Sequence, residues 1–401
     1  MITSTRTARR ATSSFSLSAI ALAAIALTLS ACGGGSSDTS ATAAPAPLPP
    51  LANQLYAETN ETANAVVHLS RNADGGISVK NRTATGGMGL DGVKPGAAKP
   101  GPDSLVSQNS VIVSADKTLL FAVNGGDASI SVFSIDQSSG DLTLKKVTKT
   151  LGTTPSSLAF RNGFLYVSYQ TGSDQLGTYA LQADGSLTQL GLYHLPTVAA
   201  ATPTQLVVSP DANFVVVSAG TASNALLSYP MNKDGTLGAP LSNAANTPFA
   251  GVFASPTVYL TTDIGAKGLS SYSVSNAGAL SLISSAMGGE AGPCWLALTP
   301  NGKYAYVGNA AGSISSYMVD ASGGLTLLNA KAAQEAGVIA GVPSVSGDSW
   351  ISADGKFLYS DYLGDDKIVA YSINPDGSIS KINEQIIGTS SSLSLQGLTG
   401  I

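Results

Sequence analysis

A four-strand unit that recurs along the chain constrains the fold more than any other feature. Each copy opens with a short polar turn, continues through two apolar runs, and ends with a polar hairpin and a further apolar run. Three well-separated copies open at 114–117 (Ser-Ala-Asp-Lys), 299–303 (Thr-Pro-Asn-Gly-Lys) and 352–356 (Ser-Ala-Asp-Gly-Lys). Self-similarity at a fixed period is the signature of a repeat architecture.

The residue pattern inside one unit predicts its structure. Apolar residues alternate with polar ones over five to seven positions, as in half-buried strands. The pairs Asp184-Gly185, Asp234-Gly235 and Asp376-Gly377 supply the positive φ that tight hairpins need. One unit is therefore a four-stranded antiparallel sheet, which buries its faces only by stacking on neighbouring units.

Seven such units fit into the chain, and they predict an all-β, seven-bladed β-propeller over residues 51–401. Each unit has about 50 residues, the size of a propeller blade. The units cover about 54–87, 104–152, 153–196, 202–250, 251–293, 294–341 and 344–388. A two-sheet sandwich is the alternative, but it does not explain seven similar units.

The first unit lacks its innermost strand, and an apolar run remains at the chain end. We expect this run, Leu393–Leu398, to pair with Leu55–Thr59 and to close the ring. Closure removes the exposed strand edges that an open array would present.

The N-terminal residues predict export. Arg6, Arg9 and Arg10 precede an uncharged apolar stretch, and Leu29-Ser30-Ala31-Cys32 follows it. This order is typical of a secretory signal peptide, here residues 1–31, and the last four residues resemble the bacterial lipobox. We therefore expect lipidation at Cys32, with an ordinary signal peptide and a chance cysteine as the alternative. Residues 32–50 are rich in Gly, Ser, Ala, Thr and Pro, which predicts a flexible tether.

These features predict a protein that is anchored by lipid to the bacterial cell envelope, facing the periplasm or the surface. Once Cys32 is lipidated, Cys294 is the only other cysteine, so no disulfide can form within the chain. Without its signal peptide the chain has 17 basic and 25 acidic residues, a formal charge of −8. That charge argues against nucleic acid as a partner. We expect a monomer whose partners are the membrane and a small lactone or organic acid.

One segment breaks the repeat. Residues 84–109 are rich in glycine and contain Lys94-Pro95-Gly96 and Lys99-Pro100-Gly101-Pro102, so the link is longer than the others. Long connections of this kind are often functional. A plain surface loop is the alternative.

With the repeats aligned, residues 51–401 resemble the seven-bladed lactonase propellers, which include bacterial 6-phosphogluconolactonases and fungal 3-carboxymuconate-cyclising enzymes. The resemblance depends on the repeated polar turn, on the strands Phe121–Asn124 and Tyr306–Asn309, and on the Asp-Gly-Ser-Leu hairpins. The segment Pro293-Cys294-Trp295 is similar to one in exported members. The resemblance implies a propeller that hydrolyses or forms a small lactone at its central channel.

The chain departs from that family at the channel. The resemblance implies His and Arg at the start of several innermost strands. The matching positions here are Gln108-Asn109, Thr204-Gln205, Cys294-Trp295 and Gly347-Asp348. The chemistry of the relatives that depends on His and Arg therefore cannot be transferred residue by residue.

Carboxylates are the better candidates for chemistry. Asp348 and Glu290 flank starts of innermost strands, and with Gln205 they are the predicted catalytic residues, as general acid, general base or orienting group. Glu58 and Asp263 lie in or after second-strand runs. Such acids could instead hold a divalent cation, or be solvated turn residues. The predicted substrate-binding residues are Trp295, Trp350 and Asn109.

Other reactive residues favour structural roles. His68 lies in a third-strand pattern and is expected to be packed, His194 is expected in a loop, and Cys294 is expected to be a buried thiol. No cofactor-binding motif is present in the sequence. Two functions remain open: a lactonase-like hydrolase or cyclase, and a non-catalytic propeller that binds or scaffolds other components of the cell envelope.

Overall fold

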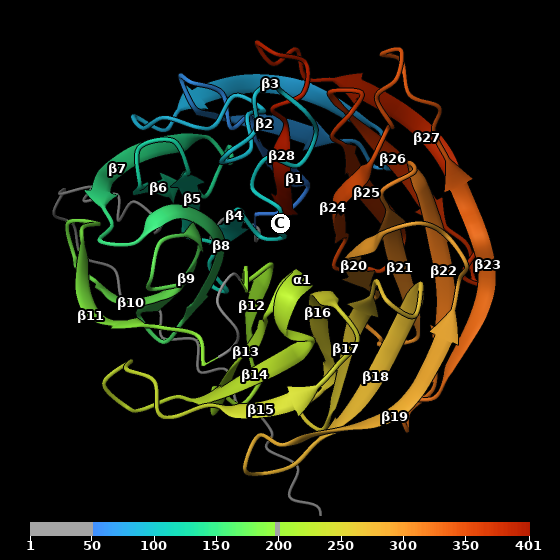
Figure 1. The fold of residues 1–401 in the computed structure, drawn as a ribbon. Coiled ribbons are helices and arrows are strands. Elements are labelled where there is room, and N and C mark those ends of the chain that lie inside the picture. The colour runs from blue at the N-terminus through green and yellow to red at the C-terminus, as the bar shows by residue number, and fades with distance from the viewer. Residues whose placement is uncertain (1–50, 197–200) are drawn as a thin grey trace, which may run out of the picture. The chain divides into compact units, whose positions relative to one another are not determined.

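The alternating residues form twenty-eight strands in the computed structural model, which describes residues 51–196 and 201–401. The predicted signal peptide, Cys32 and the tether lie outside the described residues. The strands make seven four-stranded antiparallel sheets that are arranged in a ring (Figure 1). Among the described residues the single helix is the short α1 (Gly220–Ser223). The predicted seven-bladed propeller is confirmed.

Each blade takes its four strands in chain order from the ring axis outward, except the first. Blade 1 consists of β28 (Gln396–Gly400), β1 (Gln54–Glu58), β2 (Ala65–Arg71) and β3 (Ile77–Ala84). Blade 2 consists of β4 (Val111–Val113), β5 (Leu119–Asn124), β6 (Ser129–Ile135) and β7 (Leu142–Lys149). Blade 3 consists of β8 (Thr153–Arg161), β9 (Phe164–Thr171), β10 (Leu176–Leu181) and β11 (Leu187–Tyr193).

The other four blades follow the same order. Blade 4 consists of β12 (Gln205–Val208), β13 (Phe214–Ser218), β14 (Ala225–Pro230) and β15 (Leu241–Ala244). Blade 5 consists of β16 (Pro248–Ser255), β17 (Val258–Asp263), β18 (Gly268–Val274) and β19 (Leu280–Met287). Blade 6 consists of β20 (Pro293–Leu298), β21 (Tyr304–Asn309), β22 (Ser313–Val319) and β23 (Leu325–Gln334). Blade 7 consists of β24 (Ser346–Ile351), β25 (Phe357–Tyr362), β26 (Lys367–Ile373) and β27 (Ile379–Ile386).

The C-terminal strand closes the ring. β28 pairs antiparallel with β1, with Leu55 opposite Gly400 and Ala57 opposite Leu398. β28 also contacts the innermost strands of both neighbouring blades, β4 and β24, so that all seven innermost strands form an unbroken series of contacts. The predicted closure by the chain end is confirmed.

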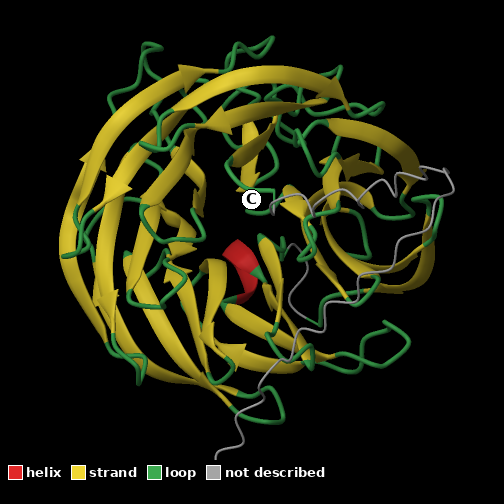
Figure 2. Cartoon of the chain, turned by 180° about the vertical axis from the view of Figure 1, so that it is seen from behind, coloured by secondary structure: helices red, strands yellow, loops and turns green. Residues whose placement is uncertain are grey.

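The two ends of the ring differ. We call the end with the hairpins between third and fourth strands the turn face. Each of its seven hairpins has a glycine with positive φ: Gly75, Gly140, Gly185, Gly235, Gly278, Gly323 and Gly377. We call the opposite end, where residues 85–110 and the other connections join successive blades, the mouth face. The mouth face is turned to the viewer in Figure 1, and the turn face in Figure 2.

Contacts on the turn face connect neighbouring blades. A Cβ atom on Gly235 would lie 2.3 Å from the ring of Phe164 in the preceding blade, and one on Gly377 would lie 2.5 Å from Tyr304. The hydroxyl of Tyr306 donates to the carbonyl of Gly377 at 3.0 Å, and that of Tyr359 donates to Gly75 at 2.9 Å. The hairpin glycine is thus needed both for its φ and for close packing between blades.

Candidate functional site

The long connection between β3 and β4 reaches the centre of the ring. Its last part, which we call the axial segment (Asp103–Asn109), lies against innermost strands on opposite sides of the ring. The Oγ of Ser107 donates to the carbonyl of Ser156 in blade 3 at 2.7 Å. The indole Nε1 of Trp295 in blade 6 donates to the carbonyl of Ser107 at 3.1 Å.

Gln108 makes the most extensive contacts of the axial segment. Its side-chain Nε2 donates to the carbonyl of Leu296, and the backbone N–H of Leu296 donates to its Oε1, both at 2.9 Å. Its own backbone N–H donates to the carbonyl of Thr204, at the start of blade 4, at 3.1 Å. Gln108 thus bonds blade 6 through its side chain and blade 4 through its backbone. Together with the contacts of Ser107, these bonds carry the axial segment across the ring axis.

Four carboxylates, which we call the acid cluster, lie beside the axial segment where blades 7 and 1 meet. Asp348 is on β24, Asp361 on β25, Glu58 on β1, and Asp103 in the axial segment. Asp348 Oδ2 accepts the backbone N–H of Asn109 at 3.0 Å, and Asp103 Oδ1 accepts Nε2 of Gln396 at 3.0 Å. Glu58, Asp348 and Asp361 are buried, whereas Asp103 is partly exposed.

Burial raises the pKa of all four carboxyls. Loss of hydration raises the pKa of Asp103 to about 6, that of Asp348 to about 7 and that of Glu58 to about 8. Burial also raises the pKa of Asp361 well above its usual range, and repulsion from Asp348 and Asp103 adds to that rise. The acid cluster can therefore exchange protons near neutral pH.

Several oxygens of the acid cluster have no hydrogen-bond partner among the described residues. They are Glu58 Oε2, Asp348 Oδ1 and both carboxylate oxygens of Asp361. The described part of the chain nevertheless contains no group of three or more His, Cys, Asp or Glu side chains with the geometry to hold a metal ion. The divalent cation considered from the sequence therefore has no set of three such ligands among the described residues.

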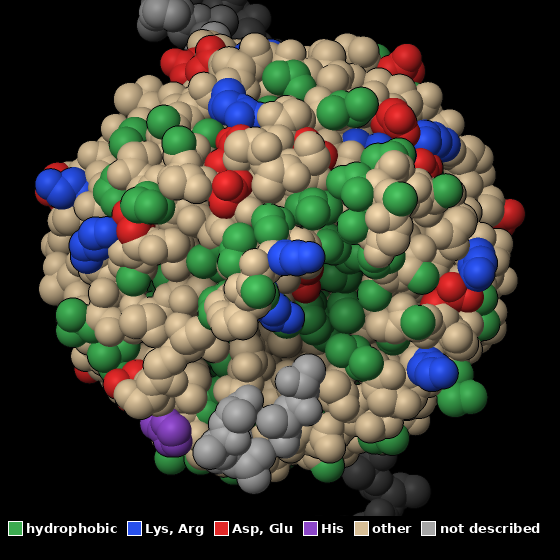
Figure 3. All heavy atoms as spheres, turned by 45° about the horizontal axis from the view of Figure 1, so that its top comes forward, with side chains coloured by type: hydrophobic (Ala, Val, Ile, Leu, Met, Phe, Trp, Pro, Cys, Tyr) green, Lys and Arg blue, Asp and Glu red, His purple; other side chains and the backbone are tan. Residues whose placement is uncertain are grey.

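The exposed end of the acid cluster opens on the mouth face. Lys94 is exposed and close enough to Asp103 to lower the pKa of that carboxyl against the larger effect of burial. Figure 3 shows a hollow near the middle of this face, with hydrophobic side chains in it and both basic and acidic side chains beside it. The partly exposed carboxyl of the acid cluster, Asp103, thus lies near a cation, Lys94.

The three predicted catalytic residues have different hydrogen-bond partners. Asp348 belongs to the acid cluster. Glu290 Oε2 instead accepts a hydrogen bond from Ser313 at 3.1 Å and lies 3.6 Å from Nζ of Lys331, both in blade 6. Gln205 Oε1 accepts the backbone N–H of Gly251, in the next blade. Gln205 and Glu290 thus bond to blades 5 and 6 and not to Asp348.

The predicted substrate-binding residues also separate. Trp295 is buried under the axial segment and lies edge-on to Phe249 at 5.3 Å between ring centroids. Asn109 belongs to the axial segment and bonds Asp348 through its backbone. Trp350 instead stacks under the guanidinium of Arg71, 5.0 Å from its ring centroid, nearer the turn face. Asn109 therefore adjoins the acid cluster, Trp295 lies against the axial segment, and Trp350 packs against Arg71.

The remaining candidates have structural environments. His68 is buried, with Nε2 2.6 Å from Gln54 Oε1 and Nδ1 3.2 Å from Asp141 Oδ1. Asp263 accepts the Oγ–H of Ser270 at 3.0 Å. Cys294 is a buried free thiol whose pKa is raised by burial.

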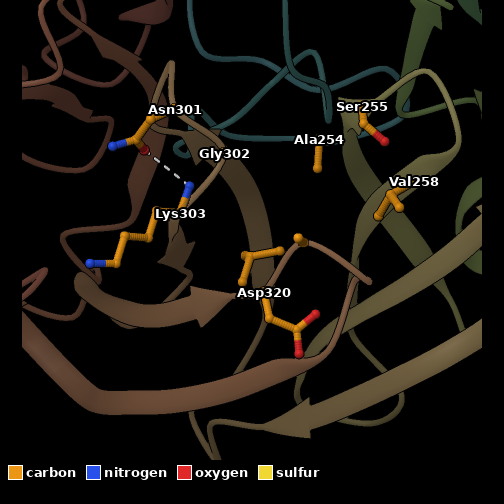
Figure 4. A pocket seen from close by; sticks show the side chains of 9 residues that line it. Ala254, Ser255, Val258, Asn301, Gly302, Lys303 and Asp320 are labelled. Atoms are coloured by element: carbon orange, nitrogen blue, oxygen red, sulfur yellow. Dashed lines mark hydrogen bonds between the residues drawn. The ribbon is translucent and has the colours of Figure 1, made fainter. Parts of the chain in front are cut away.

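Grooves between blades offer no comparable chemistry. One of about 460 Å³ lies between blades 5 and 6 on the turn face and includes Ser255, Lys303 and Asp320 (Figure 4). The side-chain oxygen of Asn301 in this groove already accepts the backbone N–H of Lys303 at 3.0 Å. Another, of about 490 Å³, lies between blades 4 and 5 and includes Asp263. The ring centre therefore remains the candidate site.

The comparison with known families agrees with this architecture. The model of the family described as lactonase, 7-bladed beta-propeller, matches residues 52–191 and 257–351, more than half of the chain. The chain belongs to the seven-bladed lactonase propeller family. The resemblance inferred from the repeats is confirmed.

Relatives of this lactonase-family propeller cover most of its blades. A 6-phosphogluconolactonase of Bacillus subtilis (strain 168) is 24% identical over an alignment of 269 residues, and the match covers 62% of this chain and 75% of the relative. The crystal structure of a periplasmic gluconolactonase of Pseudomonas aeruginosa has a TM-score of 0.64 at 17% identity, covering 86% of this chain and 98% of the other. A Lactobacillus plantarum protein has a TM-score of 0.65 at 16% identity, covering 88% and 100%. At these identities the two structures support the fold alone.

Sequence reasoning missed two members of the acid cluster in this lactonase-family propeller. Asp361 interrupts the otherwise uncharged strand Phe357–Tyr362, and an acid inside a buried strand was a usable signal. Asp103 lies in the segment that breaks the repeat, but nothing local indicates that this segment returns to the ring axis.

Proposed function

We propose that this protein is a lactonase that hydrolyses a small lactone at the mouth of the ring centre, with Asp103 as general base. The observation that carries the proposal is the partly exposed Asp103, whose pKa of about 6 suits a base at neutral pH, beside three buried acids. Membership of a lactonase family supports the reaction class. The substrate class of the Bacillus subtilis relative, a sugar-derived lactone, is the natural starting point.

The reaction needs one base and one returned proton. Asp103 takes a proton from water as the water oxygen bonds to the lactone carbonyl carbon. The ring C–O bond then breaks, and the leaving oxygen recovers that proton from Asp103, giving a hydroxy acid. The Lys94 ammonium would stabilise negative charge on the carbonyl oxygen, and protonated Asp348 would keep the local charge low.

The test uses protein that lacks residues 1–32, assayed against sugar lactones and muconolactones. We expect Asp103→Asn to lower kcat by about 10²- to 10⁴-fold, the usual contribution of a general base. Asp174→Asn, which changes a partly exposed acid at the β9–β10 turn of the same face, is the matched control and should retain activity. Full activity in Asp103→Asn would refute the assignment of the base.

A non-catalytic role is the second candidate. The axial segment across the ring axis and the missing channel His and Arg favour a propeller that binds or scaffolds a partner in the cell envelope. The same assay separates the two functions. Turnover of no lactone by the unmutated protein, together with specific retention of a cell-envelope component, would support binding and contradict the lactonase.

We also propose that the protein is exported and anchored by lipid at Cys32. The basic start, the apolar stretch and Leu29-Ser30-Ala31-Cys32 support this, and the Pseudomonas aeruginosa neighbour is described as periplasmic. Among the described residues, no helix is long and apolar enough to cross a bilayer. Cys32→Ser should move the protein from the membrane fraction to the soluble fraction, and unchanged membrane association would contradict lipidation.

A further inference from the structure

The axial segment covers the acid cluster at the ring centre. We propose that the axial segment is a movable plug, closed in this structure, which withdraws toward the mouth face to open the ring centre to a ligand. This proposal rests on the proposed function for what the opening would serve, but the movement can be tested without any substrate.

The ring does not need the axial segment for its closure. The innermost strands of neighbouring blades contact one another directly, and β28 pairs with β1. The axial segment instead packs the buried side chain of Leu105 against blade 2. It also contributes a few hydrogen bonds to several blades, of which the pair between Gln108 and Leu296 is the most regular. These bonds can break without opening a blade.

The backbone of the axial segment is strained while it is closed. Asp103, Val106 and Asn109 have φ values of 57°, 48° and 70°, in the left-handed region. For Val106, a β-branched residue, this conformation is a real outlier that persists only where surrounding contacts enforce it. Withdrawal would relieve the strain.

The residues before the axial segment leave room for movement. Residues 93–100 are exposed, and Cβ atoms built on Gly96 and Gly101 would meet nothing within 4 Å. Because this stretch leads directly into the axial segment, its freedom permits the plug to lift, a movement that also withdraws Leu105 from its core packing against blade 2.

The charged groups around the plug make its closure depend on pH. Asp103 faces Asp348 and Asp361 of blade 7, while Glu58 of blade 1 faces Asp348; the Cys294 thiol of blade 6 and Lys94 lie near Asp103. Opening would hydrate the carboxyls and return each pKa toward its usual value, so the closed state binds more protons. Asp103, which moves with the plug, therefore acts as the base after the plug has closed again over the lactone. Rising pH, through about 6 to 8, therefore favours the open plug.

Cys294 provides a direct measure of opening, because it is the only cysteine once residues 1–32 are removed. Gln108→Ala removes both bonds to Leu296 and should raise the rate of Cys294 labelling by a thiol reagent about tenfold or more. Gln205→Ala is the matched control. Gln205 is also a buried glutamine, but it lies on β12 and its side chain bonds Gly251 of blade 5 rather than connecting the plug to a blade. Equal labelling rates in the two variants would overturn the proposal.

Hydrogen exchange separates plug opening from general unfolding. We expect amides of residues 103–109 to exchange faster in Gln108→Ala, and faster in the unmutated protein as the pH rises from about 5 to about 9 after correction for intrinsic rates, while β5 stays protected. Exchange of β5 together with the axial segment, or no dependence on pH, would contradict a plug controlled by the acid cluster. A plug that opens in a protein without lactonase activity would leave this proposal standing and the proposed function refuted.

Discussion

Aspartates on the two faces of the ring have opposite electrostatic environments. On the turn face, hydrogen bonds from the hydroxyl and backbone of Ser186 lower the pKa of Asp184, and Thr236 does the same for Asp234. On the mouth side, burial raises the pKa of Asp348 and Asp361. The same residue type therefore stabilises a hairpin at one end and stores a proton at the other.

The partners of these carboxylates explain the difference. Asp184 Oδ1 accepts the backbone N–H of Ser186 at 2.9 Å, in a repeated turn that is open to water. Both oxygens of Asp361 lack a hydrogen-bond partner among the described residues. A local turn supplies its own hydrogen-bond donors. A carboxyl that is buried between segments distant in sequence has only the donors that those segments place beside it. The repeated turns thus supply donors to their own aspartates, whereas the candidate site forms where the axial segment meets strands of blades 7 and 1.

The largest expected effect concerns Trp295 on the mouth side. Trp295→Ala would leave a cavity beneath the axial segment and remove the bond to Ser107, so we expect a loss of about 3–5 kcal/mol in the free energy of unfolding. Trp350→Ala, in the half-buried stack with Arg71, should cost less. Urea denaturation measures both. Equal losses would show that the axial segment adds nothing to the packing of Trp295.

The pH dependence of stability should come from the mouth side. The pKa of Glu58 is about 8 in the folded state against 4.5 when exposed, so unmutated protein loses stability as pH rises between these values. Glu58→Gln should remove about 2–4 kcal/mol of that loss, measured by urea denaturation at several pH values. Asp184→Asn is the control. Since the pKa of Asp184 is lowered, its contribution is lost only under acid conditions, and its removal should leave this window unchanged.

Hairpin glycines of the turn face allow a matched comparison. Gly235 and Gly163 have φ values of 84° and 83°, but only Gly235 faces a neighbour, Phe164. Gly235→Ala should therefore cost about 1–3 kcal/mol more than strain alone, and Gly163→Ala should cost only the strain of about 1 kcal/mol. Similar thermal denaturation of the two variants would mean that the contact between blades contributes little.

The smallest effect concerns single hydroxyl groups. Tyr306→Phe removes the bond to the carbonyl of Gly377 in blade 7 and should cost about 1 kcal/mol in urea denaturation. The hydroxyl of Tyr229, by contrast, is buried without a partner among the described residues. Tyr229→Phe should therefore be neutral or stabilising. An equal loss in the free energy of unfolding for Tyr229→Phe and Tyr306→Phe would show that the hydrogen bond from Tyr306 to Gly377 does not stabilise the contact between blades.

The sequence predicts the blades well because their signals are local. The pair Asp234-Gly235 specifies its hairpin within four residues, and the alternating strands follow from it. Two predicted blade starts were late, by three residues at β16, which begins at Pro248, and by one at β20, which begins at Pro293. A register shift interrupts the pairing at both of these strand starts. The axial segment has no such local signal, because its position depends on Trp295 and Leu296, nearly two hundred residues away.

Side-chain direction explains why the predicted catalytic residues have different partners. Register shifts interrupt the innermost strands at their starts, between Pro248 and Gly251, between Pro293 and Trp295, and between Ser346 and Ser349. A bulge of one residue redirects every side chain before it, so a position aligned by sequence need not point to the same place. Gln205 and Asp348 start equivalent strands, yet one bonds the next blade and the other joins the acid cluster.

The pairing of β28 with β1 also has a consequence for the order of synthesis. β1, β2 and β3 are among the first strands made, but the innermost strand of their blade is the last. While the ribosome adds the other six blades, the inner edge of β1 stays without its partner, and an unpaired edge invites association with other chains. Until β28 emerges, a newly made chain is therefore most exposed to misassembly at its oldest blade, where a chaperone would have the longest time to act.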